Sequence, residues 1–312
     1  MTRAAICVIF NPAAGKGRGG QRLNKLRRVL GGRASFRPTD REGHAEDLAL
    51  IAAQEGFPIV AAAGGDGTAH EVANGILRSD RQEVTFAVIP VGSANDYAYS
   101  LGLDGDWWLR PDAGVAARPL DVGLVQSGLR SRYFINGLGL GFNGAVTLES
   151  RKIKHLQGLV LYGLALLRAL CFDFTHPRMK IRLDDGIEHD GPTLALSLAI
   201  GQREGNFVVA PDALLDDGLF DYIQAGPLTR LDLLRFVPGL AVGRLPKGHP
   251  KVLLGRCRRV QLECETPLTV HTDGEFFCRP EDGCRELAVE LLPRRLRVFC
   301  RASQSDASSG SS

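Results

Sequence analysis

The chain has 312 residues, of which 44% are hydrophobic and 23% are charged, and its formal net charge is +3. The composition is typical of a globular protein, and the length is enough for two domains of ordinary size. The weak positive charge argues against a nucleic-acid-binding protein. It is compatible with a protein that handles phosphates or visits an anionic membrane surface.

Seven cysteines are scattered along the chain, and none of them forms a C-x-x-C pair. The odd count, with no signal peptide recognised ahead of the first apolar run, indicates a reducing, cytoplasmic compartment. A zinc site of His271, Cys278 and Cys284 is conceivable, but the spacing matches no standard pattern. Buried structural cysteine is therefore the preferred interpretation.

Two further segments limit the kind of protein. The most apolar stretch, residues 156–172, is short for a membrane span and carries Arg168 near its end, so no transmembrane segment is expected. Residues 303–312 are almost entirely polar and small, which predicts a disordered tail.

The first part of the chain alternates between strand and helix patterns. The apolar runs that predict buried strands cover residues 4–10, 59–63 and 84–89. Between them, apolar residues recur with helical spacing around residues 23–30 and 45–52. This alternation predicts a three-layer α/β domain with a parallel sheet over residues 1–122. Ligands bind at the carboxyl ends of the strands in such sheets, so the turns after these strands are the expected binding site.

The pattern changes after about Pro119, where short β-type runs follow one another. Only two segments look helical, near residues 151–172 and 229–241. We therefore expect an antiparallel, β-sandwich-like domain, or a partly open barrel, over residues 123–302.

The strongest local signal is the turn Gly64-Gly65-Asp66-Gly67-Thr68, which follows a predicted strand. Thr68 and Glu71 have capping-box spacing, which predicts that a helix starts at Thr68. Glycines let backbone N–H groups approach an anion, and a helix N-terminus favours negative charge. A carboxylate at Asp66 suits this turn if Mg²⁺ lies between it and the phosphates, although it could also be a solvated cap.

Two more turns have similar chemistry. The turn after the first strand, Asn11–Gly20, is basic and rich in glycine, and Gly15, Gly17 and Gly20 satisfy G-x-G-x-x-G only weakly. It is not a P-loop, because Gly17 follows Lys16 where serine or threonine is required. A flexible basic loop is the competing interpretation.

The third turn, residues 90–98, contains Ser93 and Asp96, which together predict a helix start. Three phosphate-compatible turns on three successive strands predict one nucleotide crevice.

Carboxylates also gather in the second half. Asp273-Gly274-Glu275 forms either a simple hairpin turn or a turn that presents a general base. Residues 211–220 combine acids and free carbonyls, which suits Mg²⁺ but also suits a plain turn before a strand.

Together these segments resemble the diacylglycerol kinase catalytic-domain family, which includes bacterial lipid kinases and the sphingosine and ceramide kinases. The matching motifs are, in order, NPAAGKGRGG, GGDGTAHEVANGI, PVGSANDYAYSLGL, NGLGLGFNGAV, APDALLDDGLF and HTDGEF. They cover nearly the whole chain, to about residue 300. One such motif would be weak evidence, whereas six in the same order are specific.

The resemblance implies an ATP- and Mg²⁺-dependent lipid kinase that transfers the γ-phosphate to the hydroxyl group of a diacylglycerol-like acceptor. ATP would lie between the domains. The nucleotide-binding residues implied are Asn11, Pro12, Ala13, Ala14, Gly15, Lys16, Thr39, Gly64, Gly65, Asp66, Gly67, Thr68, Glu71, Ser93, Asn95 and Asp96. Asp273, Glu275 and Asp66 are the implied catalytic residues, with Asp273 or Glu275 as the base. The implied structural magnesium site consists of the Asp217 carboxylate and the Leu214 and Leu219 carbonyls.

Some positions depart from the family pattern. Ala69-His70 replaces a large apolar residue and asparagine, and Asn143 stands where aspartate is frequent. Ser93 replaces a threonine but keeps its hydroxyl group. His70 lies on the helix that is expected to face the crevice, and we expect it to influence nucleotide preference.

The resemblance also implies a peripheral protein that works transiently at the inner face of the membrane. Arg151, Lys152, Lys154 and His155 precede the apolar stretch 156–172, which is either a docking segment or a core helix with a basic start. Neither the acceptor lipid nor a homodimeric state can be derived from the sequence.

Three alternatives stay open. NAD kinases, which act on a soluble acceptor, also contain GGDGT. An NAD(P)-dependent oxidoreductase would need an acidic residue at the end of the second strand, where Arg37-Pro38-Thr39 stands. A nucleotide-binding module without catalysis is disfavoured by the presence of Asp66, Asp273 and Glu275.

Overall fold

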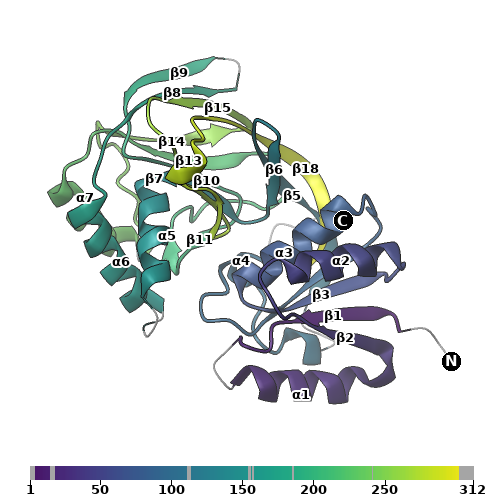
Figure 1. The fold of residues 1–312 in the computed structure, drawn as a ribbon. Coiled ribbons are helices and arrows are strands. Elements are labelled where there is room, and N and C mark those ends of the chain that lie inside the picture. The colour runs from purple at the N-terminus through teal and green to yellow at the C-terminus, as the bar shows by residue number, and fades with distance from the viewer. Residues whose placement is uncertain are drawn as a thin grey trace, which may run out of the picture. The chain divides into compact units, whose positions relative to one another are not determined.

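The computed structural model describes residues 4–14, 18–110, 114–153, 156, 158–184, 186–240 and 242–301. The chain divides into two compact units, Met1–Leu120 with Arg294–Ser312 and Asp121–Pro293 (Figure 1). It passes into the second unit through strand β5 (Val115–Ser127) and returns within strand β18 (Glu286–Arg301).

The first unit is built on a parallel sheet in the order β2-β1-β3-β4, with the last residues of β18 added beside β4. Its strands are β1 (Ile6–Phe10), β2 (Ala34–Pro38), β3 (Ile59–Gly64) and β4 (Thr85–Pro90). Its helices are α1 (Arg18–Leu30), α2 (His44–Gln54), α3 (Asp66–Arg78) and α4 (Asp96–Ser100), with short 3-10 helices η1 (Gly31–Arg33) and η2 (Trp107–Leu109).

Helices cover both faces of this sheet, because strands β1, β3 and β4 are apolar on both sides. Leu26 of α1 packs on one face with Val8 and Ala61. Helices α2 and α3 lie on the other face (Figure 1). There they pack against each other closely enough that a Cβ atom at Gly75 would lie 2.2 Å from Glu46 O. The three-layer α/β architecture expected from the sequence is confirmed.

Helix α3 begins two residues earlier than predicted. Gly65 is its N-cap residue and Asp66 its first residue, and no side chain caps it. The predicted start at Thr68 is wrong because Glu71 is used elsewhere: its carboxylate accepts hydrogen bonds from Gly43 N and Ala45 N, at 2.9 and 3.0 Å. Glu71 therefore satisfies free amides at the start of α2 rather than closing a capping box in α3.

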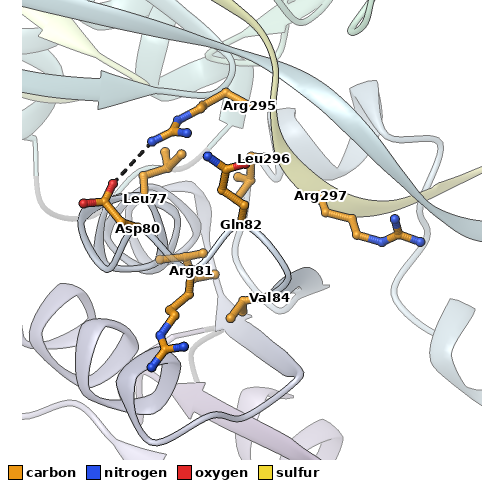
Figure 2. Close-up of a pocket in the computed structure, with 9 residues that line it drawn as sticks. Leu77, Asp80, Arg81, Gln82, Val84, Arg295, Leu296 and Arg297 are labelled. Atoms are coloured by element: carbon orange, nitrogen blue, oxygen red, sulfur yellow. Dashed lines mark hydrogen bonds and ion pairs between the residues drawn. The ribbon is translucent and has the colours of Figure 1, made fainter.

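The last residues of β18 extend the sheet of the first unit beside β4. Arg297 and Val298 pair with Thr85 and Phe86 at the start of β4. Figure 2 shows the neighbouring small pocket, where Arg295 Nη2 lies 3.4 Å from Asp80 Oδ1. Its volume of about 10 Å³ is enough for roughly one water molecule, so this pocket is not a ligand site.

The second unit contains two antiparallel sheets. One includes β18, β15 (Arg259–Cys264), β8 (Arg178–Leu183) and β9 (Ile187–Pro192), in that order, and β5 pairs with β6 (Arg130–Phe134). The other has the order β14 (Val252–Cys257), β13 (Phe220–Ala225), β10 (Ala195–Ala199), β7 (Gly137–Gly141), β16 (Val270–Thr272) and β17 (Glu275–Cys278). A short hairpin joins β11 (Arg203–Glu204) to β12 (Phe207–Val208), and the 3-10 helix η3 covers Pro280–Asp282.

The two sheets enclose one hydrophobic core, in which the rings of Phe134 and Phe220 stack with their centroids 5.6 Å apart. Strand β8 alternates between exposed and buried residues, as a strand with one face on a core does. This arrangement confirms the predicted antiparallel, sandwich-like second domain.

Three helices accompany these sheets: α5 (Phe142–Lys152), α6 (Gly158–Phe172) and α7 (Arg230–Leu240). The last two correspond to the two predicted helical segments, although α6 starts later than expected. Helix α5 was not predicted, because its first turn lies in the glycine-rich run NGLGLGFNGAV, and glycine disfavours helices.

Candidate active site

The turn after β3 leaves no room for side chains. A Cβ atom at Gly64 would lie 2.3 Å from Thr68 Oγ1. Because α3 begins at Asp66, its first N–H groups have no partner within the helix. Amides without a partner inside the helix and the positive end of the helix dipole make this turn suited to bind an anion.

The turn after β4 is in backbone contact with the turn after β3. Val91 N and Gly92 N both donate hydrogen bonds to Gly64 O, at 2.8 and 3.1 Å. A Cβ atom at Gly92 would lie only 2.5 Å from Gly65 Cα. The two predicted phosphate turns therefore form one continuous backbone surface.

Asn95 and Asp66 complete this surface. Asn95 has a left-handed backbone with φ 53° and donates from Nδ2 to Gly92 O at 2.8 Å. Asp66 Oδ1 accepts a hydrogen bond from Tyr97 N at 3.2 Å, which joins the first turn of α3 to α4. Asp96 is buried at the start of α4, whereas Ser93 is exposed in the turn.

The turn after β1 lies at the same sheet edge. Asn11 N donates to Ala63 O at 3.3 Å, and Asn11 Oδ1 accepts from Ala13 N at 2.8 Å. Thr39 N donates to Phe10 O at 2.9 Å, which places the end of β2 at this edge. Pro12 and Ala14 belong to the described part of this turn, and Gly15 and Lys16 lie outside the described residues.

A cavity of about 160 Å³ opens beside the first turn. Its lining is largely apolar and comes from the ends of β1, β3 and β4 and from α1: Phe10, Asn11, Pro12, Gly20, Arg22, Leu23, Leu26, Ala63, Ile89 and Val91. Arg22 Nη1 donates to Pro90 O at 2.9 Å and ties α1 to β4. An apolar cavity next to phosphate-compatible turns suits the base of a nucleotide.

The His70 side chain is packed inside the first unit, with Nε2 3.5 Å from Asn74 Nδ2. It is buried in α3, and Asn74 Nδ2 donates to His70 O at 3.0 Å. The influence of His70 on nucleotide preference stays a prediction.

In the second unit, the Asp273-Gly274-Glu275 turn joins β16 to β17. The Asp273 carboxylate accepts hydrogen bonds from three successive backbone amides, Ile135 N at 3.0 Å, Asn136 N at 2.8 Å and Gly137 N at 2.9 Å. Asp273 N donates in return to Gly137 O at 2.8 Å. With φ 52°, Asp273 has the left-handed backbone that the tight turn requires. Asp273 thus fixes the turn to the start of β7.

Glu275 is held more loosely. Its Oε2 lies 2.6 Å from Arg151 Nη2, and the same guanidinium group donates to Gly274 O at 3.0 Å. Its side chain is 21% exposed. Both oxygens of the Asp273 carboxylate accept backbone amides, whereas the Glu275 carboxylate pairs with a single guanidinium group.

The Asp217 turn lies next to Arg256. Asp217 Oδ1 accepts from Leu219 N at 3.1 Å, and Gly218 N donates to the buried Asp121 carboxylate at 2.7 Å. Asp217 Oδ2 is buried and lacks a hydrogen bond, although Arg256 Nη1 lies 3.3 Å away. Leu214, three residues before Asp217 in the sequence, has an exposed side chain.

Comparison with known proteins supports a specific family. A model of the diacylglycerol kinase catalytic domain matches residues 5–125, and a model of the YegS C-terminal NAD kinase beta sandwich-like domain matches residues 137–300. The diacylglycerol kinase of Bacillus subtilis is 31% identical over 88% of this chain and 90% of its own length. A probable lipid kinase YegS-like of Pseudomonas aeruginosa is 32% identical over 88% of this chain and 87% of its own.

The chain belongs to the diacylglycerol kinase family. It is therefore a kinase. A crystal structure of a putative diacylglycerol kinase from Bacillus anthracis has the same fold, with a TM-score of 0.72 over 98% of this chain and 99% of that chain at 20% identity.

Two residues that contact the DGE turn were not assigned to it by the sequence analysis. Arg151 was assigned to a basic cluster near a membrane, but it pairs with Glu275. Asn136 was part of a motif without a role, and it joins the Asp273 turn to the β11–β12 hairpin. Neither has a local signal, because each partner lies far away in the chain.

No group of three or more His, Cys, Asp or Glu side chains positioned to hold a metal ion occurs among the described residues.

Burial raises the pKa of Cys7 to about 11 and of Cys257 to about 12, which agrees with structural cysteines.

Proposed function

We propose that this kinase transfers the γ-phosphoryl group of ATP to the hydroxyl group of a lipid, with a diacylglycerol-like acceptor. The observation that carries the proposal is the DGE turn, which combines an anchored Asp273 with an available Glu275. The chain's relatives from Bacillus subtilis and Pseudomonas aeruginosa are named a diacylglycerol kinase and a probable lipid kinase.

Nucleotide binding is assigned to the first unit. The amides of the turns that contain Gly65 and Gly92 would bind the phosphates, with Lys16 and Asn11 from the first turn. The cavity beside Leu23 would hold the base. Thr39, Ser93 and Asp96 complete the set of proposed contacts.

Acceptor activation is assigned to the second unit. The lipid hydroxyl oxygen forms a bond to the γ-phosphorus, the bond between the γ-phosphorus and the bridging oxygen breaks, and ADP leaves. Glu275 takes the hydroxyl proton, and Arg151 positions the carboxylate through the ion pair with Oε2. Asp273 holds the turn through the three amides.

Magnesium, when bound, neutralises charge on the phosphate oxygens. For a structural site, Asp217 offers a buried oxygen that lacks a hydrogen bond, and such an oxygen suits a hard cation. The carbonyl groups of Leu214 and Leu219 would be the other protein ligands. Asp66 is proposed to act near the phosphates.

A lipid acceptor also requires access to a membrane, and the second unit has an apolar surface for it. No described helix is sufficiently long and apolar to cross a bilayer. Helix α6, however, exposes Val160, Leu164, Leu167 and Cys171 as one stripe. Leu231 and Leu234 are exposed on the neighbouring helix α7, whose Arg230 Nε donates to Leu170 O of α6 at 2.7 Å (Figure 1).

This apolar stripe, rather than the basic start of the segment, is the proposed membrane contact. Lys152 and Arg168 both lie 2.5 Å from the buried Glu149 carboxylate, and their hydrogen bonds lower the pKa of Glu149. The positive charges of Lys152 and Arg168 therefore pair with Glu149 within the protein. Lys154 lies outside the described residues.

Replacing Leu167 by Asn should weaken binding to phospholipid vesicles by about tenfold, because burying a leucine side chain is worth about 1.5–3 kcal/mol and 1.4 kcal/mol is a factor of ten. Vesicle co-sedimentation measures this. Leu129→Asn is the matched control, since Leu129 is fully exposed in the turn between β5 and β6. Equal binding by both variants and the wild type would rule out the stripe as the membrane contact.

The function itself is tested by incubating the protein with Mg²⁺, labelled ATP and mixed micelles of diacylglycerol, ceramide, a sphingoid base or phosphatidylglycerol. NAD serves as the soluble acceptor in a parallel reaction. We expect label in one lipid and none in NAD. Label in NAD alone would replace the proposed function by that of a kinase with a soluble acceptor.

A further inference from the structure

A third carboxylate lies close to the DGE turn. His271 precedes Asp273 by two residues on β16, and its side chain is 1% exposed. Its Nε2 atom lies 3.0 Å from Glu204 Oε1, on the β11–β12 hairpin. The Glu204 side chain is 27% exposed, so it is the member of the pair that a ligand can reach.

Gly139 lies directly against the His271 ring. His271 and Ser197 flank Gly139 on the neighbouring strands β16 and β10. A Cβ atom at Gly139 would lie 2.3 Å from His271 Nε2, so only glycine leaves room for the ring. Asn143, at the start of α5, borders the same glycine and donates from Nδ2 to Ser197 Oγ.

The hairpin that carries Glu204 shares an anchor with the DGE turn. Asn136 N donates to Asp273 Oδ1 at 2.8 Å, and Asn136 Nδ2 donates to Arg203 O at 2.7 Å. Glu204 is therefore positioned through the same residue that positions the proposed catalytic turn.

The contact between His271 and Glu204 does not satisfy the hydrogen-bonding capacity of the imidazole ring. Both ring nitrogens of His271 are buried and make no hydrogen bond to the described residues, and Nε2 has only the ion-pair contact to Glu204. A buried polar group without a partner is unfavourable, and functional sites are where such groups persist. A hydroxyl group bound to Glu204 would let the carboxylate and the imidazole realign.

We propose that Glu204 binds hydroxyl groups of an uncharged lipid headgroup and that His271 is its positioning residue. A carboxylate accepts hydrogen bonds from hydroxyl groups, and it repels a phosphate at the same position. Ser197 and Asn143 add neutral polar groups beside the pair. This assignment rests on the proposed lipid kinase function, and it makes Glu204 a determinant of which acceptor is used.

The test compares Glu204→Gln with the wild type on two acceptors in mixed micelles, monoacylglycerol with two free hydroxyl groups and diacylglycerol with one. We expect the ratio of kcat/KM for the two acceptors to change by about tenfold, since a lost hydrogen bond to a charged group is worth about that factor. KM for ATP should stay within about twofold. The matched control is Glu188→Gln, which removes a carboxylate bonded to Arg182 elsewhere in the same unit.

His271 is tested by rescue. His271→Leu should change the acceptor ratio as Glu204→Gln does, whereas His271→Gln, whose amide nitrogen can replace Nε2, should restore most of it. Loss of activity in equal proportion on both acceptors would reduce these residues to a structural role and overturn the assignment. No labelling of either lipid by the wild type would instead reject the proposed function, and this assignment with it.

Discussion

Replacing Glu275 by Gln is expected to lower kcat for lipid phosphorylation by about 10²–10⁴-fold, the usual contribution of a general base. KM for ATP should hardly change, because Glu275 belongs to the second unit and is not assigned to nucleotide binding. Stability should also change little, since the ion pair with Arg151 is partly exposed and such pairs are worth about 0–1 kcal/mol. Initial rates over a range of ATP concentrations measure kcat and KM for ATP, and thermal unfolding measures stability.

The companion variant Asp273→Asn should behave differently. Asparagine tolerates the left-handed backbone at this position. Its NH₂ group, however, would replace a carboxylate oxygen that accepts hydrogen bonds, and it would then face a backbone N–H donor. We expect a local destabilisation of about 1–3 kcal/mol, visible as faster hydrogen exchange at residues 135–137. The control is Glu281→Gln, an exposed carboxylate of the 3-10 helix η3. If Glu275→Gln retained full activity and Asp273→Asn lost it without faster exchange, the two roles would have to be reversed.

Gly92→Ala is expected to weaken ATP binding at least about tenfold and to destabilise the first unit by about 1–3 kcal/mol, the usual effect of overpacking. The added Cβ atom would lie 2.5 Å from Gly65 Cα and 3.2 Å from Gly65 N. Both are backbone atoms, so neither can rotate away, and the two phosphate turns must separate. Isothermal titration with ATP and Mg²⁺ measures the affinity.

The matched control is Gly32→Ala, because a Cβ atom at Gly32 meets nothing within 4 Å. The control should bind ATP as the wild type does. Unchanged affinity in Gly92→Ala would show that the contact between the turns has no part in nucleotide binding.

Family and fold class were predictable from the chain because their signals are local. Apolar runs such as Ile6–Phe10 and Ile59–Gly64 need no partner to be recognised, and the turns that follow them carry their glycines in sequence order. The strand order in the sheet brings these turns to one edge, as the general rule for parallel sheets predicts.

Two local sequence patterns gave incorrect predictions about helices. The capping-box spacing of Thr68 and Glu71 suggested a helix start, but Glu71 bonds to the start of α2, a competitor that only folding brings near. Helix α5 was missed because its glycines disfavour a helix. It is stabilised from outside, by Phe142 in the core and by Glu149 bonded to Arg168 of α6.

The sequence by itself determined the family, the α/β and β-sandwich classes, and the residue types at each turn, because each is encoded by neighbours along the chain. Only the tertiary structure decided that Asp273 holds the turn while Glu275 stays available, that Arg151 pairs with Glu275, and that Glu204 lies beside His271. These contacts join segments far apart in the chain. Hydrogen bonds and ion pairs form between groups that lie a few ångströms apart in space. The number of residues between two groups along the chain does not reveal whether they lie that close.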